Sequence, residues 1–148
     1  MGAEPYWYFE KYDEDIDAVL QELRQREFKA GRYYPVIMFP SELFPIGPHS
    51  PAPGAQHSSI EEAMEDADAD GTRSILDLDH VADEPEFCAV VPVPDDVLEE
   101  LYGTTQPTRP MVERLDFLDD VERGMGVYVI LYRDGKPDEI CFAGYSFD

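Results

Sequence analysis

Apolar residues in the first third of the chain predict strands where they cluster and a helix where they recur with helical spacing. Residues 5–11 are rich in aromatic side chains and predict a first strand. Over residues 13–28, apolar side chains recur at i, i+3, i+4 and i+7, as on one face of a helix. Acidic residues open this segment and Arg24 and Arg26 close it, the charge order that a helix dipole favours. Residues 33–39 are mostly apolar and predict a short buried strand.

A proline-rich stretch over residues 40–57 interrupts these patterns. Five prolines fall within it, and repeated proline removes backbone donors and restricts φ, so neither a helix nor a central strand is expected. A loop of this length inside a compact domain is commonly functional or disordered. Phe44 and Ile46 are expected to hold its middle against the core.

The middle of the chain predicts further helices and short strands. A serine at 58 or 59, followed three residues later by a glutamate, forms a capping box at the start of one helix. Phe117 lies off the apolar stripe of the last predicted helix. The predicted helices cover residues 59–69, 95–102 and 110–123, and the predicted strands cover residues 74–78 and 87–93.

The C-terminal region predicts a β-hairpin. Residues 127–133 and 139–145 are both rich in β-branched and aromatic side chains, and a Gly-containing turn over 134–137 separates them. The order of elements predicts a single α+β domain over residues 1–148. Its sheet is expected to be mostly antiparallel, with three to four helices packed on one face.

The net charge narrows the possible partners. The 148 residues include 33 acidic and 11 basic side chains, so the formal charge is −22 at neutral pH. A polyanion repels DNA, RNA and anionic membranes, so none of these is an expected partner. No apolar stretch approaches the roughly 20 residues that span a bilayer, and the N-terminus lacks the basic start of a secretory signal. A cytoplasmic protein is predicted, in which Cys88 and Cys141 stay reduced and buried in strands.

Most of the negative charge lies in one segment. Residues 58–100 hold fifteen acidic side chains against Arg73 alone, which gives −14 of the total −22. Because like charges destabilise a compact state, a basic protein partner, bound cations or a salty environment is expected to compensate. The side chains predicted to contact a basic partner are Glu61, Glu62, Glu65, Asp66, Asp68 and Asp70.

Part of this segment resembles the calcium loop of EF-hand proteins. Residues 66–77 place three aspartates at alternate positions, followed by Gly71, with Asp77 at the twelfth place. Three features depart from that family: Arg73 at the eighth place, aspartate rather than glutamate at the twelfth, and Glu65 where an apolar residue is usual. Weak, non-specific cation binding is therefore expected here, and neither a metal site nor a cofactor is predicted.

A small-molecule pocket under the proline-rich loop is an alternative site. Arg32, Tyr33, His57 and Arg73 are the residues expected to converge there. No phosphate-binding loop, dinucleotide fingerprint, HExxH helix or Gly-x-Ser-x-Gly turn occurs in the chain, so no catalytic residue is predicted.

Three functions remain open at this point. The favoured one is a binding or inhibitory protein that docks a basic protein, in the manner of bacterial immunity proteins or of proteins that imitate nucleic acid. The second is a small enzyme or ligand-binding domain with its pocket under the loop. The third is a stand-alone acidic domain whose charge reflects its environment.

Overall fold

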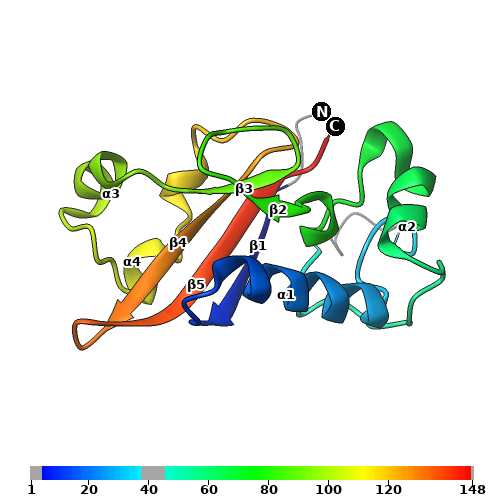
Figure 1. Cartoon of the computed structure of the whole chain (residues 1–148), viewed down its shortest axis with the longest axis horizontal. Coiled ribbons are helices and arrows are strands. Elements are labelled where there is room, and N and C mark those ends of the chain that lie inside the picture. The colour runs from blue at the N-terminus through cyan, green and yellow to red at the C-terminus, as the bar shows by residue number, and fades with distance from the viewer. Residues whose placement is uncertain (1–4, 38–45, 148) are drawn as a thin grey trace.

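A five-stranded sheet with the order β1-β5-β4-β3-β2 runs through the computed structural model, which describes residues 5–37 and 46–147 (Figure 1). The long strands pair antiparallel: β5 lies between β1 and β4. The short strands pair parallel, β2 with β3 and β3 with β4, so the sheet is mixed but mostly antiparallel. The strands are β1 (Pro5–Lys11), β2 (His80–Val81), β3 (Ala89–Pro92), β4 (Gly126–Arg133) and β5 (Lys136–Tyr145).

Four α-helices and three short 3₁₀ helices accompany the sheet in the described part of the chain. The predicted single α+β domain with three to four helices is thereby confirmed. None of these helices has the length and apolar character needed to cross a bilayer. The helices are α1 (Ile16–Ala30), α2 (Ile60–Ala67), α3 (Asp95–Tyr102), α4 (Arg109–Val112), η2 (Asp68–Asp70), η3 (Ile75–Asp77) and η4 (Asp116–Leu118).

Helices cover both faces of the sheet, so the expectation of one covered face was wrong. Side chains of a strand alternate between the two faces. In β5, Ile140 and Phe142 enter one apolar cluster with Leu20 and Leu23 of α1, and this cluster also includes Ile60 of α2. Their neighbours Cys141 and Ala143 enter a second cluster on the opposite face. That cluster is completed by Val93, Val129, Leu131, Leu98, Val112, Phe117 and Leu118.

The C-terminal hairpin is confirmed, and its turn has a clear chemical cause. Asp134 and Gly135 connect β4 to β5 with φ values of 53° and 77°. A two-residue hairpin turn with both φ values positive is of type I′, which an Asp-Gly pair favours.

The N-terminal helix and the helix after the proline-rich loop are also confirmed, with shifted boundaries. Asp15 caps α1 through its side chain, which accepts a hydrogen bond from the Ala18 amide, so the helix begins later than expected. At α2, the Ser59 hydroxyl accepts from the Glu62 amide at 3.1 Å, which is one half of the predicted capping box. Helix α3 has the predicted bounds.

Two predicted strands are turns or helices in the structure. Within the described part of 33–39, residues 33–37 form a turn, in which the Ile37 amide donates to the Tyr33 carbonyl at 2.9 Å. Residues 38 and 39 lie outside the described residues. In the predicted strand 74–78, Ser74 caps the 3₁₀ helix η3 through its side chain. Residues 74–78 are all buried, and Tyr33 and Ile37 are buried at the two ends of the turn. An apolar run without alternation does not distinguish a strand from a packed turn.

The predicted helix over 110–123 is broken into α4 and η4. Leu115 between them has φ of 60°, a left-handed conformation that ends a helix. The break lets Phe117, which lay off the predicted stripe, turn into the second cluster. Both cysteines are free thiols: Cys141 is buried in β5 as predicted, whereas Cys88 is half-buried in the turn before β3.

Candidate functional site

The described part of the proline-rich loop, residues 46–57, caps the C-terminal end of α1. The Gly54 amide donates to the Ala30 carbonyl at 2.9 Å, and the Ala55 amide donates to the Lys29 carbonyl at 3.2 Å. These carbonyls belong to the last turn of a helix, where no partner exists within the helix. Ile46 is 1% exposed and does anchor the loop, while Phe44 lies outside the described residues. The loop therefore has a structural role at this helix end.

Tyr33, His57 and Asp66 form a hydrogen-bonded chain beneath this loop. The Tyr33 hydroxyl lies 2.8 Å from His57 Nδ1, and His57 Nε2 lies 2.9 Å from an Asp66 carboxylate oxygen. Tyr33 is fully buried and stacks on Phe28, and burial raises the pKa of its hydroxyl. With the imidazole hydrogen on Nε2 facing Asp66, Nδ1 accepts the Tyr33 hydroxyl hydrogen. This chain joins the turn after α1 to α2.

The two arginines predicted to share a pocket with Tyr33 and His57 have other partners. Arg32 Nε lies 2.9 Å from an oxygen of Glu27, whose side chain is fully buried. The guanidinium of Arg73 lies 4.9 Å from the centre of the Tyr34 ring. Of the four predicted ligand-binding residues, the structure thus brings together Tyr33 and His57 and places the arginines against other groups.

The six carboxylates predicted to contact a basic partner lie on α2 and η2, and we call them the α2 surface. Three of them have polar partners within the chain. Glu62 accepts from the Ser58 hydroxyl at 2.8 Å, which lowers the pKa of its carboxyl. Asp66 pairs with His57, and the Tyr34 hydroxyl donates to Asp70 at 3.3 Å. The remaining three side chains, Glu61, Glu65 and Asp68, are exposed.

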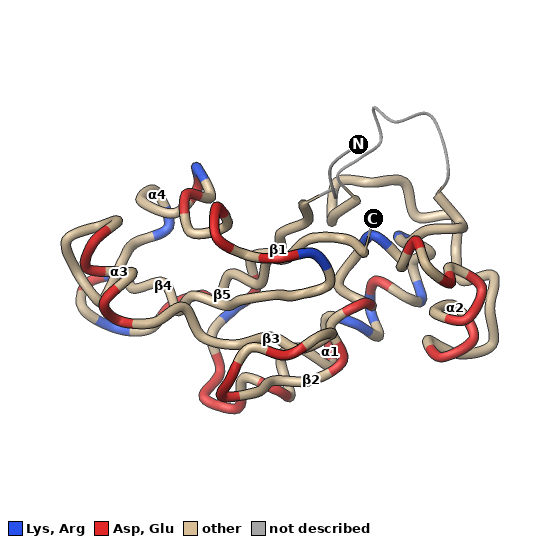
Figure 2. The backbone as a smooth tube through the Cα atoms, turned by 90° about the horizontal axis from the view of Figure 1, so that it is seen from above, with Lys and Arg blue, Asp and Glu red and all other residues tan. Residues whose placement is uncertain are grey.

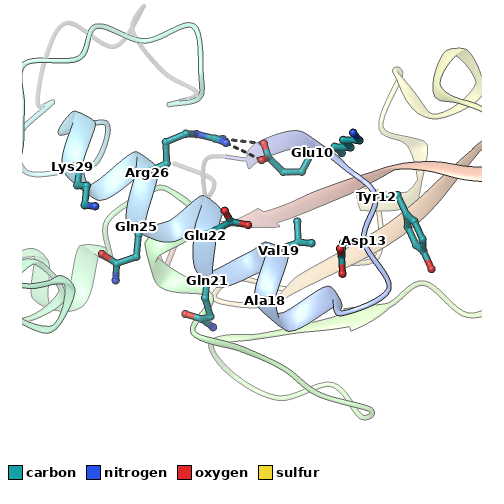
Figure 3. A pocket seen from close by; sticks show the side chains of 11 residues that line it. Glu10, Tyr12, Asp13, Ala18, Val19, Gln21, Glu22, Gln25, Arg26 and Lys29 are labelled. Carbon is teal, nitrogen blue, oxygen red and sulfur yellow. Dashed lines mark hydrogen bonds and ion pairs between the residues drawn. The ribbon is translucent and has the colours of Figure 1, made fainter.

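An open cavity of about 1040 Å³ lies between the outer side of α1 and the end of β1 (Figure 3). Its walls carry both signs of charge. Arg26 binds both carboxylate oxygens of Glu10, each at 2.9 Å, and Lys29 and Glu22 lie on the same helix. Because its opposite charges lie together and partly pair, this cavity has no strong preference for a charged ligand.

A second cavity combines an apolar floor with an acidic rim. It measures about 420 Å³ and lies on the second face of the sheet, between α3 and the η4 region. Its floor includes Val91 and Val127 of the sheet, Val97 and Leu101 of α3, and Phe117 and Val121. Its rim carboxylates are Asp83, Glu84, Glu100, Asp116, Asp119 and Asp120.

A smaller cavity of about 260 Å³ adjoins this one and extends it. The two share Pro85, Val91, Asp120, Val121 and Val127, and the smaller cavity adds two further carboxylates, those of Glu86 and Glu122. Neither lining contains a lysine or arginine of the described residues. We call the two cavities together the acidic groove.

Histidines are the only basic side chains that form ion pairs with the carboxylates of residues 58–100 in the described chain. Within residues 5–37 and 46–147, none of these carboxylates forms an ion pair with a lysine or arginine. His57 pairs with Asp66, and His80 lies between Asp79 and Glu86. Hydrogen bonds to these two carboxylates raise the pKa of His80. In Figures 1 and 2, α2 and α3 lie at opposite ends of the molecule, so the acidic segment forms two separate surfaces.

Asp77, the last residue of the EF-hand-like spacing, lies in the core. Its side chain is fully buried, and one oxygen accepts from both the amide and the hydroxyl of Thr72 at 2.7 Å. Burial is the main reason that the pKa of this carboxyl rises to about 6. No group of three or more His, Cys, Asp or Glu side chains is arranged to hold a metal ion in the described chain.

Comparison with known proteins adds no relative, because no protein-family model, no curated protein and no solved structure matches the chain. The choice of a candidate site is therefore argued from the geometry of the structure alone. The acidic groove is absent from the sequence predictions because its rim comes from three separate segments. Leu101 of α3 is 40% exposed at this groove, and the apolar spacing of the helix does not reveal that exposure.

Proposed function

We propose that this protein binds a basic protein partner through its exposed carboxylates, as an inhibitory or binding protein does. The observation that supports this proposal is that, in the described chain, no carboxylate of residues 58–100 forms an ion pair with a lysine or arginine. Arginines form ion pairs with carboxylates outside this segment: Arg26 and Arg32 pair with Glu27, and Arg109 pairs with Glu139. The densest group of carboxylates is therefore open to a cationic partner.

The physical consequence is binding that depends strongly on salt. Complementary charge accelerates association and suppresses wrong partners, and added salt screens both effects. A partner with a basic surface also relieves the self-repulsion of the free protein, so it stabilises the fold by mass action. The proposal includes a cytoplasmic location, where the free thiols of Cys88 and Cys141 stay reduced.

A small enzyme or ligand-binding domain is the second candidate, and the hydrogen bond between Tyr33 and His57 is the part of its expected pocket that comes together. Such a buried pair is a common element of binding sites when a cavity reaches it. Neither residue lines the open cavity beside α1 or the acidic groove. A thermal-shift screen of small molecules against wild type and His57→Ala tests this candidate, which predicts stabilisation by a ligand in wild type alone.

Affinity capture with matched charge variants tests the main proposal. The tagged protein is incubated with lysate of its source organism at low and moderate salt, and retained proteins are identified by mass spectrometry. Each of three variants neutralises six carboxylates, by Asp→Asn and Glu→Gln: one at the α2 surface, one at the rim of the acidic groove, and one control set elsewhere. The control set is Asp13, Glu14, Glu22, Glu113, Asp134 and Asp138, which are all exposed.

The expected result is one basic protein retained in stoichiometric amount and released by moderate salt. It should be retained by the control variant and lost from at least one of the other two. Retention by all three variants, or release that does not depend on salt, would contradict docking through these carboxylates.

A further inference from the structure

We infer that the acidic groove is the anchor site for an amphipathic basic segment of the partner, with apolar side chains on its floor and lysine or arginine at its rim. This inference rests on the proposed function, and it adds the place of binding and the chemistry of the bound segment. Three features carry it: the floor, the rim, and the contrast with the α2 surface.

The floor is apolar surface that the fold leaves uncovered. Leu98 of α3 is 6% exposed and fills the second cluster, whereas Leu101, less than one turn later, is 40% exposed at the groove. Val97 and Val121, which line the same cavity, are half-buried. The main cavity, about 420 Å³, lies within the range of roughly 300–1,000 Å³ typical of ligand sites. Apolar anchors of a partner would remove this surface from water.

The rim restricts the occupant to a cation. All six rim carboxylates are exposed, and none of them forms an ion pair with a described lysine or arginine. They come from the loop between β2 and β3, from α3 and from the η4 region, so they surround the floor. Carboxylates around an apolar wall focus a negative potential into the groove. A basic segment with apolar anchors matches both features, as in the recognition of amphipathic helices by grooves.

The α2 surface has a smaller apolar floor. Ile60, Ala63 and Ala67 of α2 are buried beneath the helix, and Met64 is half-buried. The cavity beside α2, about 600 Å³, has Ile60 and Met64 as its apolar lining and also contains Arg24 and His80, so a basic segment meets like charge there. We therefore expect both acidic surfaces to attract the basic partner at long range and the groove to hold its apolar side chains.

Two synthetic peptides of equal charge test the inference with the full chain. One is a labelled helical peptide with leucines at i, i+3, i+4 and i+7 and lysines elsewhere, and the other replaces each leucine by serine. Fluorescence anisotropy at low salt should give the leucine peptide at least tenfold higher affinity, because it alone fills the floor. Equal affinities would overturn the inference.

A pair of substitutions with identical charge identifies the place of binding. Leu101→Asp alters the groove, and Met111→Asp alters α4, where Met111 is 44% exposed and outside the groove lining. Both add one carboxylate at an exposed apolar residue. Leu101→Asp should weaken the leucine peptide about tenfold, whereas Met111→Asp should leave its affinity unchanged or slightly higher. Equal effects of the two substitutions would overturn the inference.

Methyl NMR of the wild-type chain gives a readout that needs no variant. The leucine peptide should shift the methyl signals of Val91, Val97, Val121 and Val127. Shifts confined to α2 would overturn the groove while leaving the proposed function standing on the α2 surface. If neither peptide binds at low salt, the groove inference fails, and the capture experiment decides separately whether the proposed function fails.

Discussion

The hydroxyl of Tyr33 lies 2.8 Å from Nδ1 of His57, and this contact joins the turn after α1 to the segment that leads into α2. The Tyr33 side chain is fully buried, and the His57 side chain is 10% exposed. Water therefore competes little for either atom. The Gln56 amide also donates to the Tyr33 oxygen, at 3.3 Å, so one hydroxyl holds two neighbouring loop residues.

Tyr33→Phe should lower the free energy of unfolding by about 1–2 kcal/mol, because it removes this hydrogen bond and leaves buried polar atoms unpartnered. Urea denaturation measures the change. A double-mutant cycle with His57→Ala provides the control: the histidine substitution should cost less in the Tyr33→Phe background than in wild type. Strictly additive costs would show that the two side chains do not act together.

Short sequence patterns correctly predicted the elements that depend on neighbouring residues alone. The hairpin depends on an Asp-Gly pair, and α3 depends on its apolar spacing and on Gly103, which ends the helix in a left-handed conformation. The turn at 33–37 was missed because part of its hydrogen bonding reaches residues far away in sequence. The Tyr34 amide, for example, donates to the Thr72 carbonyl at 2.8 Å.

The sequence predicted the negative charge of the candidate site, but it did not predict where in the fold that charge lies. The excess of carboxylates in residues 58–100 is visible in the sequence, but its division between two ends of the molecule depends on the fold. The groove needs Asp116, Asp119 and Asp120, which belong to a segment predicted as a continuous helix. The left-handed Leu115 breaks that helix, and no spacing rule reports such a residue.

The titration of Asp77 should contribute to the pH dependence of the free energy of unfolding. Its pKa is about 6 in the folded protein and has an ordinary value of 3.8, so between these pH values the native state holds a proton that the unfolded chain has lost. Stability from this group is therefore greatest below the lower value and falls as pH rises through the upper one. The expected size is roughly 1.4 kcal/mol for each unit of pKa difference.

Urea denaturation of wild type and Asp77→Asn from pH 4 to pH 7 measures this effect, since the difference cancels the titration of the other carboxylates. The stability of wild type relative to the variant should fall across this range and level off above it. A constant difference would show that Asp77 titrates alike in the folded and unfolded states.

Two glycines with the same backbone conformation should respond differently to alanine. Gly31 and Gly135 both have φ of 77°. A Cβ at Gly135 would meet nothing within 4 Å, whereas a Cβ at Gly31 would lie 2.2 Å from the Gly54 carbonyl oxygen. Gly135→Ala should cost about 1–2 kcal/mol for the left-handed conformation alone. Gly31→Ala should cost about 1–3 kcal/mol more, from overpacking. Thermal and urea unfolding compare the two, and equal costs would show that the loop yields freely.

Stability should also rise with salt in the free protein. The formal charge of −22 makes self-repulsion a cost of folding, and salt screens it. The Tm in sodium chloride should increase, and the variant with six neutralised rim carboxylates should start higher and gain less. A flat response would mean that carboxylate repulsion does not limit stability. A steep response with no partner captured would favour the stand-alone acidic domain.

The capping of α1 by the proline-rich loop makes two distant segments open as one. The amides of Gly54 and Ala55 both donate to carbonyls of the last helical turn, so neither hydrogen bond survives if that turn unwinds. Fraying of the helix end and release of residues 54 and 55 of the loop are therefore a single event. In hydrogen exchange, the amides of Gly54 and Ala55 should share one protection factor with the amides of Gly31 and Arg32. That factor should lie well below the protection of β5 in the interior of the sheet.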